Sequence, residues 1–345
     1  MRPTIRDVAA LAGVSHQTVS RVLNNGPYVP ATTRRAVSRT IKKLGYEPNA
    51  AARALATGKA KLIALVIPDI GNPHFARIAR ATSEHAERNG YGTLLCHSAE
   101  DPARERGFLR AITNHRVDGV ILCSSRLSAA SLREFVSVHS RVVLINRRLR
   151  DDRVPAVMAD AEVGAWAAAR LLLDLGHRII GVIVFSPPSE SARVRLRGYR
   201  RAFEERGLVL DTRLVRRSSP DIAGGYAAAG SLLARSPRPS ALLCTNDLIA
   251  LGAMQAVFSG GGAVPKDVSI VGFDDIAAVG SSAPTLTTVH IPQEQLAYTA
   301  VDLLVARMNG DANPTSPVIL PTHLIVRAST AAIDSPAGRA LPRTQ

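Results

Sequence analysis

Several apolar segments of this 345-residue chain are followed by polar side chains that offer hydrogen bonds in pairs. Carboxylate, amide and guanidinium groups of this kind suit the vicinal hydroxyls of a small polar ligand, and an aromatic ring supplies a stacking face. Each residue taken alone is also an ordinary turn or cap residue. Taken together, they predict a ligand site. These residues are Asn72, Phe75, Asn146, Arg147, Asn246 and Asp274.

The elements that would position these side chains follow from the alternation of short β-rich segments with helical stretches. That alternation indicates βαβ units and a mainly parallel, doubly wound sheet, whose ligands bind beyond the carboxyl ends of the strands. The pattern begins at Leu62 and restarts at Val163, so we expect two lobes with a cleft between them. The expected strands are Leu62–Ile67, Thr93–Cys96, Gly119–Cys123, Val142–Ile145, Ile179–Val184, Ala241–Cys244 and Val268–Gly272. The expected helices are Phe75–Asn89, Glu105–Asn114, Val163–Leu175, Arg193–Arg206, Asp247–Phe258 and residues 293–309.

The beginning of the chain has a different pattern. Two apolar-periodic segments, Ile5–Ala12 and Ser15–Leu23, meet at Gly13, and Thr4 and Ser15 are suited to cap them as helices. This is the helix-turn-helix plan, whose second helix lies in the major groove of DNA, although an ordinary amphipathic helical hairpin fits the spacing too. The polar side chains expected to face outward from the second helix are His16, Gln17, Thr18, Ser20 and Arg21.

The inward face of this helix pair is expected to carry Val14, Val19 and Leu23, with a third helix over residues 31–44 packed against it. Charge favours the DNA interpretation. Residues 1–58 hold nine Lys and Arg side chains and two acidic ones, a net +7 of the +15 on the whole chain. Such a basic head is typical of a module that binds a polyanion, with phosphate contacts for affinity and base contacts for specificity.

The motifs of this head resemble those of the LacI family of bacterial transcriptional repressors, and the resemblance covers most of residues 1–329. It implies that Thr4, Ser15, Asn24, Asn49 and Ala52 also belong to the DNA-binding set, and that Leu55 of a hinge helix is inserted into the minor groove. It also places Arg195 in the ligand site. The head motifs are Thr4–Ala9, Gly13–Ser15, Thr18–Asn24, Thr33-Arg34, Leu44–Tyr46, Pro48-Asn49 and Ala52–Leu55.

The domain organisation implied by the resemblance is an all-α helix-turn-helix head on an α/β, two-lobed core like that of periplasmic binding proteins, with two doubly wound parallel sheets. We expect the chain to cross between lobes near Met158–Glu162, Thr288–Pro292 and Ile319–Thr322. The expected boundaries are residues 1–48 for the head, 49–60 for the hinge helix, 61–329 for the core and 330–345 for a disordered tail. Within the core, lobe 1 is 61–159 and 290–320, and lobe 2 is 160–289 and 321–329.

Three positions depart from the family pattern. Asn146 stands where many members have Asp, His290 begins a motif that usually starts with Arg, and Pro220 replaces an aromatic residue of several sugar-binding members. Aromatic residues make up only 4% of the chain. The effector class therefore stays open among a sugar, a sugar acid and a sugar phosphate.

Other classes of protein fit less well. There is no apolar run of about 18 residues and no secretion signal, which argues against a membrane protein and an exported solute-binding protein. Cys96, Cys123 and Cys244 lie in or next to apolar runs, as buried reduced thiols of the cytosol would. No metal-ligand spacing, Walker loop or nucleophile motif is present, so no cofactor and no enzyme activity are expected.

The sequence therefore predicts a cytoplasmic transcription regulator, most simply a repressor of carbohydrate-related genes. It would bind a pseudo-palindromic double-stranded DNA operator as a homodimer, because one short recognition helix reads few bases. A small effector in the inter-lobe cleft would control DNA affinity through the hinge helix. A member whose ligand acts as a corepressor, or that is controlled by a protein, remains an alternative, because both signs of coupling use the same cleft and hinge.

Overall fold

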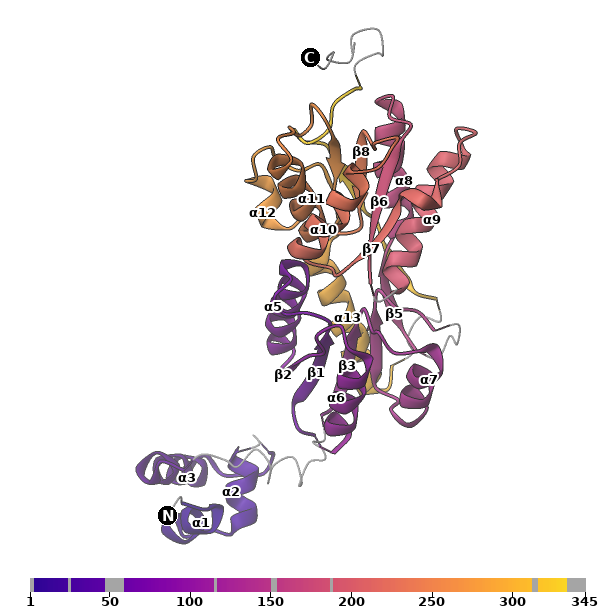
Figure 1. The fold of residues 1–345 in the computed structure, drawn as a ribbon. Coiled ribbons are helices and arrows are strands. Elements are labelled where there is room, and N and C mark those ends of the chain that lie inside the picture. Colours follow the sequence, from indigo (N-terminus) through magenta and orange to yellow (C-terminus); the bar gives the residue numbers. More distant parts are fainter. Residues whose placement is uncertain are drawn as a thin grey trace, which may run out of the picture. The chain divides into compact units, whose positions relative to one another are not determined.

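The structure is a computed structural model that describes residues 3–23, 26–46, 59–114, 117–149, 154–186, 189–311 and 316–333. The predicted DNA contacts Asn24, Asn49, Ala52 and Leu55, with nearly all of the expected hinge helix, lie outside these residues. The chain divides after Lys61 into two compact units, a head and a core (Figure 1).

The head consists of three helices: α1 (Ile5–Ala12), α2 (His16–Leu23) and α3 (Ala31–Leu44). Their common core is small and aliphatic. Val19 is buried on α2 as predicted, but the second fully covered position is Val22, while Val14 and Leu23 are only partly buried. Val22 lies three residues after Val19, the spacing that keeps two side chains on one face of a helix. The fully buried apolar residues of the head are Val8, Ala9, Val19, Val22 and Val37.

The caps that define these helices agree with the sequence pattern. Thr4 and Asp7 form a capping box on α1, in which the Thr4 side chain accepts from the Asp7 backbone N–H and Asp7 accepts from the Thr4 backbone N–H. Ser15 accepts a hydrogen bond from the backbone N–H of Thr18, 3.1 Å away, at the start of α2. Gly13 provides the turn with a φ of +66°, a conformation that favours glycine. These caps fix the angle at which α2 leaves α1.

The first lobe of the core is built on a six-stranded parallel sheet of order β11-β5-β4-β3-β1-β2. Its strands are mostly buried on both faces because helices cover it, as expected of a doubly wound sheet (Figure 1). The strands are β1 (Leu62–Ile67), β2 (Gly92–His97), β3 (Gly119–Cys123), β4 (Val142–Ile145), β5 (Ala156–Ala159) and β11 (Val318–Leu320). The helices are α5 (Pro73–Arg88), α6 (Pro102–Asn114), α7 (Ala129–Val138) and α13 (Gln293–Asn309).

The second lobe has a four-stranded parallel sheet of order β7-β6-β8-β9, with a separate antiparallel pair, β10 and β12. The strands are β6 (Ile180–Phe185), β7 (Val215–Ser218), β8 (Ala241–Cys244), β9 (Ser269–Val271), β10 (Thr288–His290) and β12 (His323–Ile325). The helices are α8 (Ala161–Asp174), α9 (Glu190–Glu204), α10 (Ile222–Leu233), α11 (Asp247–Ser259), the short α12 (Ala277–Gly280) and the 3-10 helix η1 (Thr212–Leu214).

The predicted fold class is confirmed, and most predicted elements are observed within two or three residues of their expected bounds. Elements without a clear apolar period were not predicted. β7 contains two arginines, and α10 is made largely of Ala and Gly, so neither shows the alternation that marks a half-buried element. The β10–β12 pair was also missed, since both strands are only three residues long.

The chain passes between the lobes at three places: between β5 and α8, between β10 and α13, and between β11 and β12. Residues 330–333 correct the expectation of a disordered tail beginning at residue 330. The Ala331 backbone N–H donates to the Ser269 hydroxyl, and that of Ile333 donates to the Leu175 carbonyl. These bonds attach residues 330–333 to the second lobe, so its last segment extends beyond Ser329.

The three cysteines are buried and unpaired, as predicted. Burial raises the pKa of the Cys123 thiol to about 12, so this side chain stays protonated and unreactive at neutral pH. Among the helices that the structure describes, none is both long and apolar enough to cross a membrane.

Candidate functional site

A small buried cavity of about 30 Å³ lies at the carboxyl ends of strands from both lobes of the core. Residues from α5, from the ends of β3, β4, β6 and β8, from the segment after β9 and from α9 line it. Six of the seven predicted ligand-site residues are among them: Asn72, Phe75, Asn146, Arg195, Asn246 and Asp274. We call this cavity the central cleft.

An ion pair between Arg195 and Asp274 lies at the centre of this site. The Arg195 guanidinium donates to Asp274 Oδ1 at 3.0 Å, and both side chains are about 95% buried. A second nitrogen of Arg195 donates to the Thr245 carbonyl, and its guanidinium carbon lies 3.9 Å from the centroid of the Phe273 ring. The Nε of Arg195 is buried with no partner among the described residues. The arginine is thus held in place by three kinds of contact and retains one unused donor.

Three asparagines of the cleft share a structural role. The amide oxygen of Asn72 accepts from the His74 backbone N–H at the start of α5, and that of Asn246 accepts from the Ile249 N–H at the start of α11. The amide oxygen of Asn146 accepts from the Ala159 backbone N–H and so joins the end of β4 to the end of β5. These bonds orient the three amides, so the asparagines also have the structural role of ordinary turn or cap residues. All three still line the cavity.

His74 is a cleft residue that was not predicted, although it stands beside Phe75 in the sequence. Its Nδ1 lies 3.8 Å from Asp274 Oδ1, and its ring packs edge-on against Phe75. Burial lowers the pKa of His74, and the nearby Asp274 carboxylate opposes this shift only in part. The imidazole is therefore neutral at pH 7, and it can accept as well as donate a hydrogen bond.

Arg147 is the predicted ligand-site residue that the structure places elsewhere. Its guanidinium donates to Glu190 Oε2 at 3.0 Å and to the Leu127 carbonyl at 3.1 Å, and it lines a separate, larger cavity rather than the central cleft. Asn146 adopts a left-handed backbone conformation with a φ of +51°. We attribute the difference to this turn, because it sends the neighbouring side chains of Asn146 and Arg147 in different directions.

Other cleft residues missed from the sequence are Phe185 and the Glu100–Arg126 ion pair. Phe185 is the last residue of β6, so its position at a strand end was the available signal. Glu100 follows β2 at a left-handed turn with a φ of +60°, and nothing in the local sequence indicates that it reaches the cleft.

The candidate nucleic-acid interface is the exposed side of α2. His16, Gln17 and Arg21 are exposed there, while Thr18 and Ser20 are partly covered. The hydroxyls of Ser15 and Thr18 lie 2.9 Å apart in a hydrogen bond. His16, Gln17 and Arg21 are therefore the side chains of α2 best placed to reach base edges.

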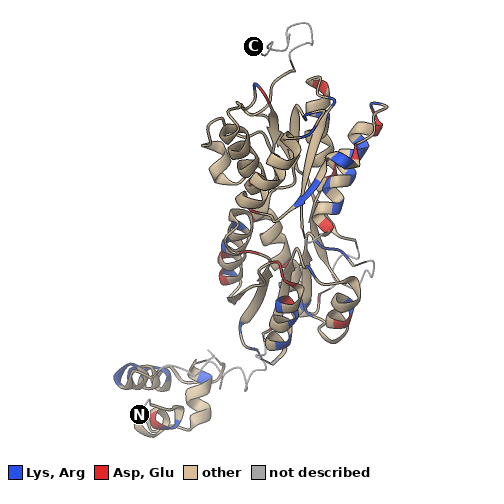
Figure 2. Cartoon of the chain, viewed as in Figure 1, with Lys and Arg blue, Asp and Glu red and all other residues tan. Residues whose placement is uncertain are grey.

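Basic positions of the head gather on α3 (Figure 2). One of them, Arg34, is engaged inside the head: it donates to the Gly26 carbonyl at 3.1 Å and to the Val22 carbonyl at 3.4 Å. This places a cation at the carboxyl end of α2, where the helix dipole favours it. Arg34 thus supports the recognition helix, whereas Arg35, Arg39, Lys42 and Lys43 are exposed.

Within the described ranges, no group of three His, Cys, Asp or Glu side chains could hold a metal ion. Burial raises the pKa of the Asp247 carboxyl group well above its usual value. It accepts from the Thr288 hydroxyl and the Ile276 N–H, so its surroundings give it a structural role.

Two family models match the chain. The model described as bacterial regulatory proteins, lacI family, matches residues 4–49, and the model described as a periplasmic binding protein-like domain matches residues 169–330. The HTH-type transcriptional repressor PurR of Haemophilus influenzae (strain PittEE) is 34% identical over 334 residues, which cover 96% of this chain and 99% of that protein.

Solved structures of transcription regulators are also similar to this chain. The lac repressor dimer bound to operator and the anti-inducer ONPF is similar with a TM-score of 0.86 and 28% identity, over 96% of this chain and 100% of that one. A complex of the transcriptional regulator CelR with cellobiose is similar with a TM-score of 0.73 and 32% identity, over 95% of this chain and 100% of that one.

Proposed function

The chain belongs to the LacI family of bacterial regulatory proteins, and from this premise we propose that it represses carbohydrate-related genes in the cytoplasm under the control of a sugar-like effector. A DNA-binding helix-turn-helix head and a ligand-binding core are the family's two functional parts. The finer assignments concern the operator, the effector and the oligomeric state, and each draws on a separate feature of the molecule.

Operator binding is assigned to the exposed face of α2 and to the basic surface of α3. Arg21 can pair with N7 and O6 of guanine, and Gln17 with N6 and N7 of adenine. The exposed lysines and arginines of α3 supply phosphate contacts, which give affinity that falls steeply with salt. Leu55, outside the described residues, is proposed to wedge into the minor groove at the operator centre.

Effector binding is assigned to the central cleft, and the Arg195–Asp274 pair is the observation that carries this assignment. Its guanidinium and carboxylate are already oriented, are buried, and border a cavity that Phe75 also lines. One of two adjacent hydroxyls can accept from the Arg195 Nε that has no partner among the described residues, and the other can donate to Asp274. The amides of Asn72, Asn146 and Asn246 add further polar partners on the wall.

The size of the cleft determines how the effector would enter. A volume of about 30 Å³ is far below the several hundred Å³ of ordinary small-molecule sites. The lobes must therefore separate to admit a sugar ring, and the three crossing segments form the natural hinge. A ligand that favours one degree of opening shifts the population of that state, and the hinge helix would transmit the change to DNA.

A homodimer is proposed from the edge of the first sheet. β2 is the last strand of the order and, among the described strands, pairs only with β1. It exposes Leu94 and Leu95, with 37% and 40% of their surfaces accessible. An apolar edge strand in contact with water favours association, and a second copy of the chain would cover it. Two heads related by two-fold symmetry then account for a pseudo-palindromic operator.

The effector assignment can be tested by calorimetric titration of the purified full chain with neutral sugars, sugar acids and sugar phosphates. We expect one chemical class to bind saturably and to change operator affinity. Asp274→Asn should weaken that binding at least tenfold, since it removes the charged acceptor but preserves the shape. Asp311→Asn is the matched control, because Asp311 is an exposed carboxylate away from the cleft. Equal binding by Asp274→Asn and wild type would refute the site.

The direction of the response decides between two forms of the proposal. Release of operator on ligand binding makes the ligand an inducer, and tighter binding makes it a corepressor. In both cases the Asp274 substitution should abolish the response while DNA binding persists. Turnover of the responding sugar by the purified chain would instead indicate an enzyme.

A further inference from the structure

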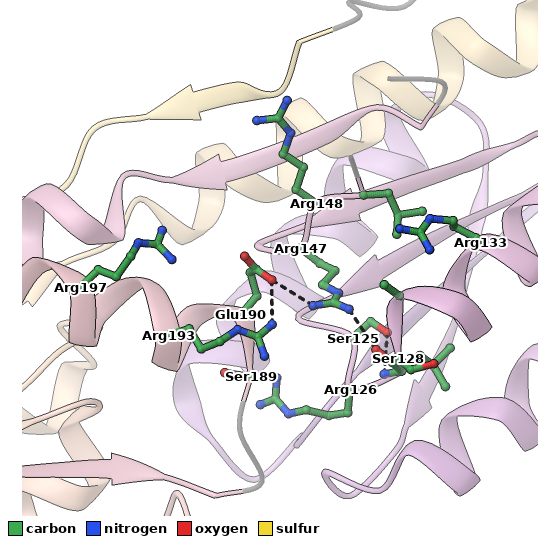
Figure 3. A pocket seen from close by; sticks show the side chains of 13 residues that line it. Ser125, Arg126, Ser128, Arg133, Arg147, Arg148, Ser189, Glu190, Arg193 and Arg197 are labelled. Atoms are coloured by element: carbon green, nitrogen blue, oxygen red, sulfur yellow. Dashed lines mark hydrogen bonds and ion pairs between the residues drawn. The ribbon is translucent and has the colours of Figure 1, made fainter. Parts of the chain in front are cut away.

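A second, larger cavity of about 960 Å³ lies between the two lobes of the core, and arginine dominates its wall (Figure 3). One side comes from the segment after β3, the start of α7 and the segment after β4, and the other from the first turns of α9. We call it the arginine cavity. Arg126 is its only lining residue, among those described, that also lines the central cleft. Its six arginines are Arg126, Arg133, Arg147, Arg148, Arg193 and Arg197.

The wall has fewer carboxylate side chains than guanidinium groups. Glu190 is the only acidic side chain that lines the cavity among the described residues. Its Oε2 accepts from both Arg147 and Arg193, each at 3.0 Å, so one carboxylate serves two guanidinium groups (Figure 3). Arg133 has no ion-pair partner in the part of the chain that the structure describes. The wall therefore carries an excess of positive charge.

Charges near the wall reduce this excess without removing it. Glu105 acts on Arg147 and raises its pKa, and Arg148 has an interaction of its own. Arg126 pairs with Glu100, and Arg197 with Glu162, which accounts for one cation each. Excess positive charge confined in a concave site raises the local concentration of small anions.

Arg147 is a buried side chain that is held in place and can still bind a ligand. It is 93% buried, and its Nε has no partner among the described residues. Burial lowers the pKa of Arg147, and the Glu190 carboxylate opposes this shift, so the guanidinium remains charged at neutral pH. Its bond to Glu190 joins the two lobes, because Arg147 follows β4 while Glu190 begins α9.

Hydroxyl and helix-terminal groups complete the wall. Ser128 caps α7 and Ser189 caps α9, and both residues line the cavity. The amino ends of two helices therefore border the same space, where their dipoles favour negative charge. Guanidinium groups recognise phosphate oxygens in pairs, so arginines on opposite walls suit a ligand with more than one anionic group.

From these features we infer that the arginine cavity binds a small molecule carrying two or more phosphoryl groups, at a site separate from the central cleft. The ligand would bridge the lobes by binding Arg133 on one side and Arg193 on the other, with Arg147 between them. It would also compete with Glu190 for Arg147, and so weaken the existing inter-lobe ion pair. Occupancy of this cavity would then bias lobe closure independently of the sugar-like effector.

The test is a calorimetric titration of the full chain with pyrophosphate and tripolyphosphate, with inorganic phosphate and citrate as comparison ligands. Arg133→Gln/Arg193→Gln should weaken tripolyphosphate binding at least tenfold. Arg104→Gln/Arg200→Gln is the matched control, because it removes the same charge from exposed positions on α6 and α9 that do not line the cavity, and its affinity should stay within twofold of wild type.

Five outcomes would overturn the inference. Equal losses of tripolyphosphate affinity in the two double variants would mean that only overall charge matters. Unchanged binding by Arg133→Gln/Arg193→Gln would place the polyphosphate elsewhere, as on the basic head. Tighter binding of citrate than of pyrophosphate would reject phosphoryl chemistry. Asp274→Asn should leave tripolyphosphate binding unchanged. If it weakens this binding as much as Arg133→Gln/Arg193→Gln does, the arginine cavity and the central cleft are one site. Cavity-dependent binding of a phosphopeptide, without binding of tripolyphosphate, would replace the small ligand by a protein partner.

Discussion

Removal of Asp274 should destabilise the core as well as abolish the effector response. Asp274→Ala takes away the only carboxylate that pairs with Arg195 among the described residues, and both side chains are about 95% buried. The guanidinium then remains buried with the Thr245 carbonyl and the Phe273 ring as its partners. An uncompensated buried charge is unfavourable, because the protein interior solvates it poorly.

The magnitude follows from the loss of one partner of a buried pair, which typically costs about 3–5 kcal/mol. We expect the lower end, about 3 kcal/mol, because the carbonyl contact of Arg195 survives. For a unit of this size each kcal/mol shifts the melting temperature by roughly 2 °C, so the core transition should fall by about 6 °C. Asp274 has a φ of +114°, which asparagine tolerates, and Asp274→Asn keeps an amide oxygen for Arg195. Its loss of stability should therefore be smaller, about 1–2 kcal/mol.

Differential scanning calorimetry of the full chain measures both variants, with Asp311→Asn as the control. Arg195→Met, alone and in the Asp274→Ala background, completes a double-mutant cycle. Because the buried charge is then absent, the double variant should be more stable than the sum of the single effects predicts. A shift below about 1 °C for Asp274→Ala, or strictly additive effects, would refute the view that Asp274 neutralises Arg195.

Three further predictions concern the head and the second lobe. Arg21→Ala should relax the base preference at one operator position by about 1–3 kcal/mol in a binding-site selection, and a uniform loss over all sequences would make Arg21 a phosphate contact. Arg34→Ala should destabilise the head by about 1–3 kcal/mol in thermal unfolding, because the carbonyls of Val22 and Gly26 lose a charged donor, and unchanged head unfolding would contradict this role. Burial lowers the pKa of His177 below its ordinary 6.5. The neutral imidazole therefore contributes its full stabilisation above about pH 6.5, and this stabilisation is lost as the pH falls from about 6.5 toward the lowered pKa. His177→Gln should flatten this loss in acid titrations, and an unchanged slope would exclude His177 as its source.

Much of the fold could be predicted because the apolar pattern is strong where strands are buried on both faces. β1, β3, β4 and β8 are nearly continuous apolar runs, and their bounds agree with the prediction. Elements whose stability depends on tertiary contacts lack such a pattern. α10 packs its small side chains against α11, and its Gly225 leaves no room for a Cβ beside the Ile249 carbonyl. The periodicity of apolar residues along the sequence does not reveal such a close approach of two helices.

The candidate site could be predicted in part for a similar reason. Residues after parallel strands converge because the strands do, which brought Asn146, Asn246 and Asp274 to one cavity. The direction of a side chain within a turn is set by backbone torsions that the sequence does not state. Asn146 adopts a positive φ, and its neighbour Arg147 consequently lies in the arginine cavity. Glu100 reaches the cleft through a similar turn.

The central claim, that this chain reads DNA under the control of a small ligand, is tested most directly by selecting bound sequences from random duplexes with the purified full chain. The selected operator is then titrated with sugars, sugar acids and sugar phosphates. We expect a two-fold symmetric consensus whose affinity changes with one ligand class, and an Asp274→Asn variant that binds the same consensus without responding. Absence of any consensus at low and moderate salt, or a consensus that no ligand affects, would contradict it.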